Sequence, residues 1–296
     1  SVQKTARVVE ASDGLAYVRQ GGQNLPAKTA IERERLRLDK GVHSFESTPV
    51  DVEMDVVSES EVLEQFVRDV IPASKPMKYL RSQSLIKNGK PVVAAVLLFS
   101  DEPQAALPKR SAVKLYRYGT ADETGTRDSL KGDPETIEGP LYDLIVRAVD
   151  RTVAVLEGIK KLGPKGLEPV TYPRETLHEI VTNAVLHRDY SIPADIQIRV
   201  FDNRVEVESP GVLPGHVTLK NMLDEQFARN GALVRLINKF KNPPNKDVGE
   251  GLNTAFEAMQ RLRLKPPSII ETKSSLVVKI RHEPLATPEQ SVMDYL

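Results

Sequence analysis

The chain has 296 residues, 40% hydrophobic and 28% charged, so it is long enough to bury the cores of two or three domains. Its 41 basic and 41 acidic residues give a formal net charge of zero, which excludes a global field that would attract nucleic acid. It has no cysteine, which excludes disulfides and cysteine metal sites, and no apolar run of the roughly 18 to 20 residues that span a bilayer. We therefore expect a soluble, cytoplasmic protein.

Turn and capping signals divide the first hundred residues into short elements. In order, we expect two strands within 8–21, helices at 27–38, 58–70 and 77–85, a turn at Asn88-Gly89 and an apolar block at 91–100. From residue 58 onwards this pattern fits a small winged-helix-like unit or another α+β unit, and periodicity does not separate the two.

Long helices and strand pairs alternate in the rest of the chain. In order, we expect a strand at 113–118, a polar connection at 121–133, helices at 140–161 and within 175–190, a hairpin at 196–207, a polar segment with two helices at 213–247, and a closing hairpin at 269–280. The first hairpin is indicated by Ile196, Ile198 and Val200, which alternate with polar residues.

The helix within 175–190 has one polar and one apolar side. Glu175, Glu179, Asn183 and His187 recur every fourth position, and the opposite side consists of Leu177, Ile180, Val181, Ala184 and Val185. A carboxylate one turn before a carboxamide suits a site where the acid polarises a water and the amide oxygen holds a hydrated magnesium ion. The alternative is an ordinary solvated polar face.

A glycine pair follows the polar segment. Gly249 and Gly251 precede an amphipathic run through Ala255, Met259 and Leu262. Glycines at a helix start let backbone amides approach a phosphate, which the helix N-terminus favours electrostatically. The pair alone is a weak signal for nucleotide binding, and the Glu179/Asn183 helix upstream strengthens it.

The order of these elements resembles the ATP-binding domain of the GHKL superfamily, which gyrase, MutL and histidine kinases share. The resemblance covers about residues 140–283 and implies an α+β fold, the left-handed α/β sandwich called the Bergerat fold. It implies that Glu179 is the catalytic residue that orients or activates water, and that Asn183 is the magnesium ligand. It also implies a variable lid over the nucleotide, at 213–247.

A narrower resemblance is to a subgroup described as predicted transcriptional regulators or RecG-like proteins. Its marks are Asn183-Ala184, His187 to Tyr190, Glu208 to Gly211 with Leu213-Pro214, Arg229-Asn230, and the helix from Gly249 to Met259. Besides Asn183, the implied ATP contacts are His187, Arg188, Glu208, Pro210, Gly211, Arg229, Gly249, Gly251 and Leu252. His187 could equally cap its helix.

The subgroup also implies a division of the chain. We expect the tail of a Schlafen-type (divergent Alba) nucleic-acid-binding domain at 1–48, the small α+β or winged-helix-like domain at 49–138, the ATP-binding domain at 139–283, and the start of a C-terminal winged helix at 284–296. The opening Ser1 and the capping pattern from Thr287 to Gln290 indicate a fragment of a longer protein.

Two departures from the GHKL pattern concern the nucleotide. The aspartate that accepts the adenine amino group is absent, since the aligned position is close to Val207, with Glu208 next to it. Glu250 also adds a negative charge between the two glycines. His178-Glu179 begins like a zinc-protease motif, but Thr182 occupies the position of its second histidine, which excludes that zinc site. The chain also has no P-loop, which argues against a P-loop helicase.

These features predict a module that binds magnesium and ATP, with slow hydrolysis, in a nucleic-acid-binding transcriptional regulator or defence protein. The expected partners are DNA, through flanking domains, and a second copy of the chain. The alternatives are a vestigial fold that acts as an interaction module, and the regulatory body of a Schlafen-like nuclease.

Overall fold

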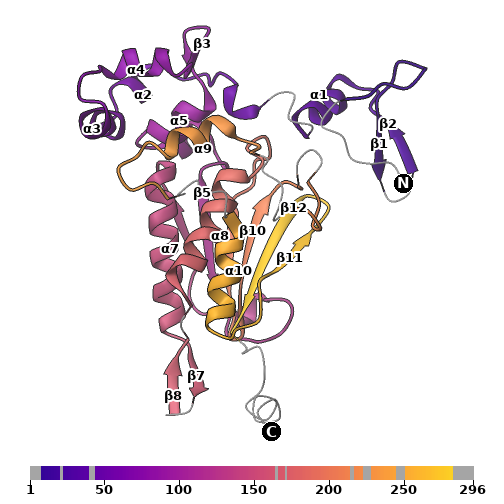
Figure 1. Cartoon of the computed structure of the whole chain (residues 1–296), viewed down its shortest axis with the longest axis vertical. Coiled ribbons are helices and arrows are strands. Elements are labelled where there is room, and N and C mark those ends of the chain that lie inside the picture. The colour runs from indigo at the N-terminus through magenta and orange to yellow at the C-terminus, as the bar shows by residue number, and fades with distance from the viewer. Residues whose placement is uncertain are drawn as a thin grey trace.

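The computed structural model describes residues 8–20, 23–39, 44–163, 166–170, 172–213, 217–222, 228–244 and 251–282. The described elements form a mixed α+β fold (Figure 1). It consists of an N-terminal unit (residues 8–39), a helical subdomain (residues 44–107), and a six-stranded mixed sheet with helices on one face.

The N-terminal unit is a hairpin followed by a helix. Its elements are β1 (Tyr17–Gln20), β2 (Gln23–Pro26) and α1 (Ala30–Asp39). Of the two strands predicted within 8–21, only the second forms, as β1, and it pairs with β2. The described residues before it contribute one bridge, between Glu10 and Ala16. Ala16, Ala27 and Leu36 form a small core of its own. Its assignment to a Schlafen-type domain stays a prediction.

The helical subdomain contains short helices and one two-residue strand pair. Its elements are η1 (Phe45–Ser47), α2 (Asp55–Ser58), α3 (Glu61–Val70), α4 (Pro76–Ser82), β3 (Ile86–Lys87), β4 (Lys90–Pro91), α5 (Val93–Phe99) and α6 (Pro103–Ala106). Helix α3 begins later than the predicted start at residue 58, because Ser60 is its N-cap and the Ser60 Oγ accepts a hydrogen bond from the Leu63 amide at 3.2 Å. The apolar block forms α5, in which every residue is buried.

Six strands form the central sheet in the order β11-β12-β10-β9-β5-β6. They are β5 (Ala112–Arg117), β6 (Glu135–Glu138), β9 (Ile196–Val200), β10 (Arg204–Pro210), β11 (Ser268–Glu271) and β12 (Ser275–Arg281). Strands β5 and β9 are parallel, and the other neighbours are antiparallel. Both predicted hairpins are confirmed, β9 with β10 and β11 with β12.

The predicted boundary between residues 138 and 139 falls inside this sheet. Strands β5 and β6 lie before that boundary, yet β5 pairs with β9, with Leu115 opposite Ile198. One continuous hydrophobic core also joins Phe66 and Phe99 of the helical subdomain to Val207 of β10. The helical subdomain and the sheet therefore share one core. Local periodicity did not show this, because a pairing between distant segments leaves no periodic signal.

Helices cover one face of the sheet, as Figure 1 shows. They are α7 (Leu141–Glu157), α8 (Arg174–His187) and α10 (Gly251–Arg261), and α8 contacts both of the others. Helix α9 (Gly231–Ile237) lies beside the helical subdomain. Strands β7 (Lys160–Gly163) and β8 (Gly166–Pro169) form a hairpin after α7, which ends before the predicted residue 161. The 3-10 turn η2 (Arg127–Ser129) lies between β5 and β6.

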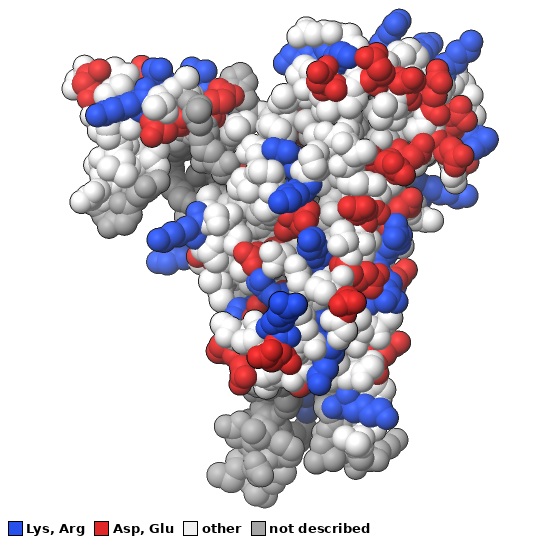
Figure 2. Space-filling view, turned by 180° about the vertical axis from the view of Figure 1, so that it is seen from behind, with Lys and Arg blue, Asp and Glu red and all other residues white. Residues whose placement is uncertain are grey.

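Among the described helices, none combines the length and the apolar composition that crossing a membrane requires. Lysine, arginine and acidic side chains are interspersed over the face in Figure 2, in keeping with the formal net charge of zero.

Candidate functional site

Helix α8 carries the polar stripe that the sequence predicts. Its apolar side, including Leu177, Ile180 and Val181, is buried against α7, α10 and the sheet. On the other side, Glu175 is exposed in the first turn, while Glu179, Asn183 and His187 are half-buried. A half-buried polar stripe on a central helix differs from a freely solvated face, because its groups have lost much of their contact with water.

Glu179 and Asn183 form a hydrogen-bonded pair on this stripe. The Asn183 Nδ2 donates to Glu179 Oε1 at 2.5 Å and to the Glu179 carbonyl oxygen at 2.9 Å. Within the described chain, nothing donates a hydrogen bond to the Asn183 Oδ1 or to the second carboxylate oxygen of Glu179. Burial raises the pKa of Glu179, and the hydrogen bond from Asn183 partly opposes that rise.

His187 lies one turn beyond Asn183, at the last position of α8. Burial lowers its pKa to about 4, and the positive charge of Arg229 contributes to the lowering. The imidazole is therefore neutral at pH 7, so any contact with a phosphate would be made by a neutral donor rather than by a cation.

Arg188 is buried and its guanidinium binds backbone carbonyls, while its predicted contact with the cofactor stays a prediction. Its side chain is 1% exposed and its guanidinium donates to the carbonyl oxygens of Arg110, Ile192 and Ala194 at 2.7 to 3.0 Å. The same group lies 4.9 Å from the centre of the Tyr190 ring. These bonds tie the end of α8 to the segments around Arg110 and Ala194.

Arg229 is also held by protein groups. It forms a buried ion pair with Asp189, with 3.0 Å between Nη1 and Oδ2, and it donates to the Val212 carbonyl oxygen at 2.7 Å. The neighbouring Asn230 is 1% exposed and donates from Nδ2 to the carbonyl oxygens of Leu186 and Arg188, both at 2.9 Å. The two bonds from Asn230 satisfy carbonyls at the end of α8. The predicted contact of Arg229 with ATP stays a prediction.

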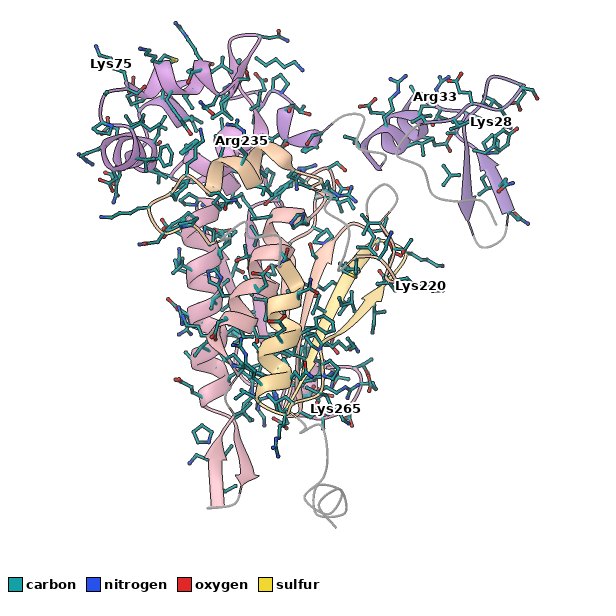
Figure 3. The ribbon with its side chains drawn as sticks, in the orientation of Figure 1. Lys28, Arg33, Lys75, Lys220, Arg235 and Lys265 are labelled. Atoms are coloured by element: carbon teal, nitrogen blue, oxygen red, sulfur yellow. The ribbon has the colours of Figure 1, made fainter. Side chains whose placement is uncertain are left out.

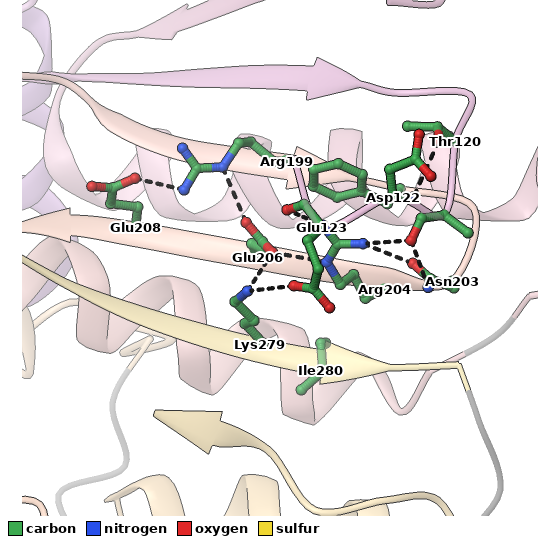
Figure 4. Close-up of polar contacts among 12 residues, drawn as sticks. Thr120, Asp122, Glu123, Arg199, Asn203, Arg204, Glu206, Glu208, Lys279 and Ile280 are labelled. Carbon is green, nitrogen blue, oxygen red and sulfur yellow. Dashed lines mark hydrogen bonds and ion pairs between the residues drawn. The ribbon is translucent and has the colours of Figure 1, made fainter. Parts of the chain in front are cut away.

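Glu208 faces away from α8, and its predicted contact with the cofactor stays a prediction. On β10 the adjacent Ser209 donates to the Ala184 carbonyl oxygen of α8 at 2.8 Å, and successive strand residues point to opposite faces. Figure 4 shows Glu208 on the other face, where it pairs with Arg199 at 2.5 Å. Ser275 donates to its second oxygen at 2.6 Å.

The turn after β10 lies beside the end of α8. The Pro210 carbonyl oxygen accepts a hydrogen bond from the Asp189 amide at 2.8 Å. Gly211 has φ +108°, and a Cβ atom there would lie 2.7 Å from the Cβ of Asp189. Only glycine combines this backbone conformation with so close an approach. The predicted position of Pro210 and Gly211 under a base stays a prediction.

The phosphate motif is only partly described. Gly251 is the first residue of α10, which packs along α8. Gly249 and the side chain of Leu252 lie outside the described residues, as do residues 214–216, 223–227 and 245–250 of the predicted lid and motif. Among the described residues, no group of three or more His, Cys, Asp or Glu side chains could hold a metal ion.

Sequence reasoning missed Asp189 and Asn230 as the residues that hold the end of α8. Asp189 and Asn230 lie in the Arg188-Asp189-Tyr190 and Arg229-Asn230 segments that carry the family resemblance. In each segment the resemblance implies that the neighbouring arginine contacts ATP. The available signal was the adjacency of an arginine and an aspartate or asparagine in each segment, which suits buried ion pairs and helix caps as well as ligand binding.

Comparison with known proteins supports an ATPase-like domain. Residues 194–280 match the family model described as "Putative ATP-dependent DNA helicase recG C-terminal". The matched range includes β9 to β12 and α10 but begins after Glu179 and Asn183. A search of curated protein sequences found no match.

A solved structure shares the fold. The crystal structure of the DIP2311 protein from Corynebacterium diphtheriae superposes with a TM-score of 0.60 over 93% of this chain, at 20% sequence identity. This chain spans 46% of the length of that protein. The similarity extends over the helical subdomain as well as the sheet, so both belong to a fold seen in another protein.

Proposed function

We propose that this chain binds magnesium and ATP over α8 and α10, in a fold of the GHKL type. The observation that carries the proposal is the Glu179–Asn183 pair, in which the amide nitrogen holds the carboxylate and the amide oxygen has no donor in the described chain. The match of residues 194–280 to an ATPase-like family supports it independently, because that range contains α10 and the adjoining strands.

The residues present fit magnesium that arrives with a nucleotide. Magnesium keeps several waters and usually takes only one or two protein ligands besides substrate phosphates. One amide oxygen, that of Asn183, therefore suffices, in keeping with the lack of a larger metal-ligating cluster among the described residues. When bound, the ion would supply neutralisation of phosphate charge.

Glu179 is proposed as the residue that accepts a proton from water. Its raised pKa brings the carboxylate closer to the operating pH, which favours proton acceptance. The hydrogen bond from Asn183 restricts the rotation of the carboxylate, so the second oxygen keeps one orientation. We propose that the chain hydrolyses ATP slowly, and that proton acceptance by Glu179 accelerates this hydrolysis by about 10²- to 10⁴-fold.

We further propose that the module regulates a nucleic-acid-binding protein through flanking domains, and that it can act as a homodimer. In Figure 3, Lys28 and Arg33 lie together on the N-terminal unit, far from Lys265 after α10. With both signs of charge interspersed on the body (Figure 2), DNA contact is assigned to flanking domains rather than to the sheet and its helices.

The test is a titration of the purified chain with fluorescent ATP, with magnesium and with a chelator in its place. We expect saturable binding with magnesium and at least tenfold weaker binding without it. Absence of binding in both conditions would replace the proposal by the interaction-module alternative. Equal binding in both would remove the metal role of Asn183.

A further inference from the structure

A buried carboxylate joins the start of the helical subdomain to the helix after the predicted lid. Glu46 of η1 is 4% exposed and lies far from α9 in the sequence. Its Oε1 accepts the Ala232 amide at 2.9 Å and its Oε2 accepts the Leu233 amide at 2.8 Å. Ser44 adds a bond from its Oγ to the Arg229 carbonyl oxygen at 3.2 Å.

The residues immediately before α9 hold the end of α8. Asn230 donates to two carbonyls there, and Arg229 binds Asp189 and the Val212 carbonyl. Without Asn230, those carbonyls at a buried helix end would lose their partner. Residues 229–233 therefore contact Glu46 on one side and the C-terminal end of α8 on the other.

Helix α9 is otherwise attached to the helical subdomain. Arg235, labelled in Figure 3, donates to the Gln83 side-chain oxygen at 2.7 Å, and Lys239 donates to the same oxygen at 3.2 Å. Phe240 stacks on Tyr142 of α7 with 4.9 Å between ring centres. These contacts hold residues 235–240, whereas Glu46 binds the backbone amides of Ala232 and Leu233 at the start of α9.

We propose that Glu46 is a positioning residue for the nucleotide site, acting through residues 229–233 on the last turn of α8. The inference rests on the proposed function, since Asn183 lies one turn before that end. Ser44 and Glu46 are close in sequence to the N-terminal unit (residues 8–39), so we infer that a partner bound to that unit could act on the nucleotide site through this contact. Because such coupling is reciprocal, nucleotide binding would also change the strength of the hydrogen bonds between Glu46 and the start of α9.

The experiment compares Glu46→Ala and Glu46→Gln with Glu64→Ala, an exposed glutamate of α3 in the same subdomain. Amide hydrogen exchange is measured first, without nucleotide. Glu46→Ala should accelerate exchange at least tenfold at residues 184–188, with little change in α7 or β12. Glu46→Gln keeps one acceptor oxygen and should give an intermediate effect, and Glu64→Ala none.

Magnesium-dependent ATP affinity is then measured for the same proteins. It should fall at least fivefold in Glu46→Ala and less in Glu46→Gln. Unchanged exchange at 184–188, or an equal acceleration throughout the chain, would overturn the inference, as would altered exchange with unaltered ATP affinity. A parent protein that binds no ATP would instead refute the proposed function, while the exchange result would still decide whether Glu46 holds α8.

Discussion

The two polar atoms of the Asn183 side-chain amide have different environments. The nitrogen donates to Glu179, and the oxygen receives no hydrogen bond from the described chain. Removing this side chain therefore takes away the proposed metal ligand and the one donor that two Glu179 oxygens share, at a cost of about 1 kcal/mol. The two effects can be separated experimentally, because one concerns binding and the other stability.

Asn183→Ala should abolish magnesium-dependent ATP binding while leaving the melting temperature nearly unchanged. The measurement is a titration with and without magnesium beside a thermal unfolding scan. Glu175→Gln is the matched control, because Glu175 lies on the same stripe but is exposed in the first turn. Unaltered affinity in Asn183→Ala would show that this amide is not a ligand.

Glu179→Gln should reduce ATP turnover by about 10²- to 10⁴-fold while nucleotide still binds, because the amide cannot accept the proton. Burial raises the pKa of Glu179, so in the parent the acidic limb of the turnover profile should lie above the ordinary glutamate value. Steady-state hydrolysis across pH checks both statements. A variant as fast as the parent would move the catalytic role to another residue.

At the scale of elements, the end of α8 and the turn after β10 depend on one another. The Pro210 carbonyl accepts the Asp189 amide, while Gly211 lies against the Asp189 side chain. The turn supplies the carbonyl that binds the Asp189 amide, and Asp189 approaches so closely that the turn must have a glycine at residue 211. A side chain added at Gly211 would therefore disturb both.

Gly211→Ala should destabilise the protein by about 2 to 5 kcal/mol, the sum of backbone strain and overpacking. Gly89→Ala is the control, because Gly89 also has positive φ, +76°, but a Cβ there would meet nothing within 4 Å. It should cost only about 1 to 2 kcal/mol. Urea unfolding measures both, and equal losses would mean that the contact with Asp189 relaxes freely.

At the scale of the whole molecule, the helices face one side of the sheet and an ion network occupies the other. Arg204, fully buried, donates to Glu206 at 2.8 Å, and Lys279 and Arg199 complete the pairing of Glu206 at 3.0 and 3.3 Å. Although burial opposes it, this pairing lowers the pKa of Glu206. The network in Figure 4 therefore holds β9, β10 and β12 together through side-chain ion pairs.

The stability of the whole chain should depend on the protonation of His187. Its pKa is about 4 in the folded protein against 6.5 for the free group, so the folded state binds fewer protons between these values. The resulting stability, up to about 3 kcal/mol, is fully present above pH 6.5 and is lost as pH falls towards 4. Glu46 and Glu179 have raised pKa values and act in the opposite direction.

Comparison with His187→Gln separates these contributions, because both proteins share the two glutamates. Urea unfolding from pH 7 to pH 4 should show the parent losing stability relative to the variant as the pH falls. A difference that stays constant over this range would mean that His187 is solvated in the folded state.

The local sequence predicted the polar stripe of α8 and both hairpins. Each depends on a short-range period, 3.6 residues in a helix and 2 in a strand, so Glu179 and Asn183 meet wherever the helix is placed. The apolar block that forms α5 was ambiguous for the same reason, since a continuous apolar run has no period that distinguishes a buried helix from a strand.

The sequence by itself determined the identity of these elements, the chemistry of the α8 stripe and the zero net charge. Only the tertiary structure decided that Arg188 and Arg229 bind backbone carbonyls and Asp189, that Glu208 faces away from α8, and that β5 joins β9. Each of these depends on which distant segment lies opposite a residue. That choice is made by the burial of the shared core and the pairing of backbone groups across it, which no local pattern contains.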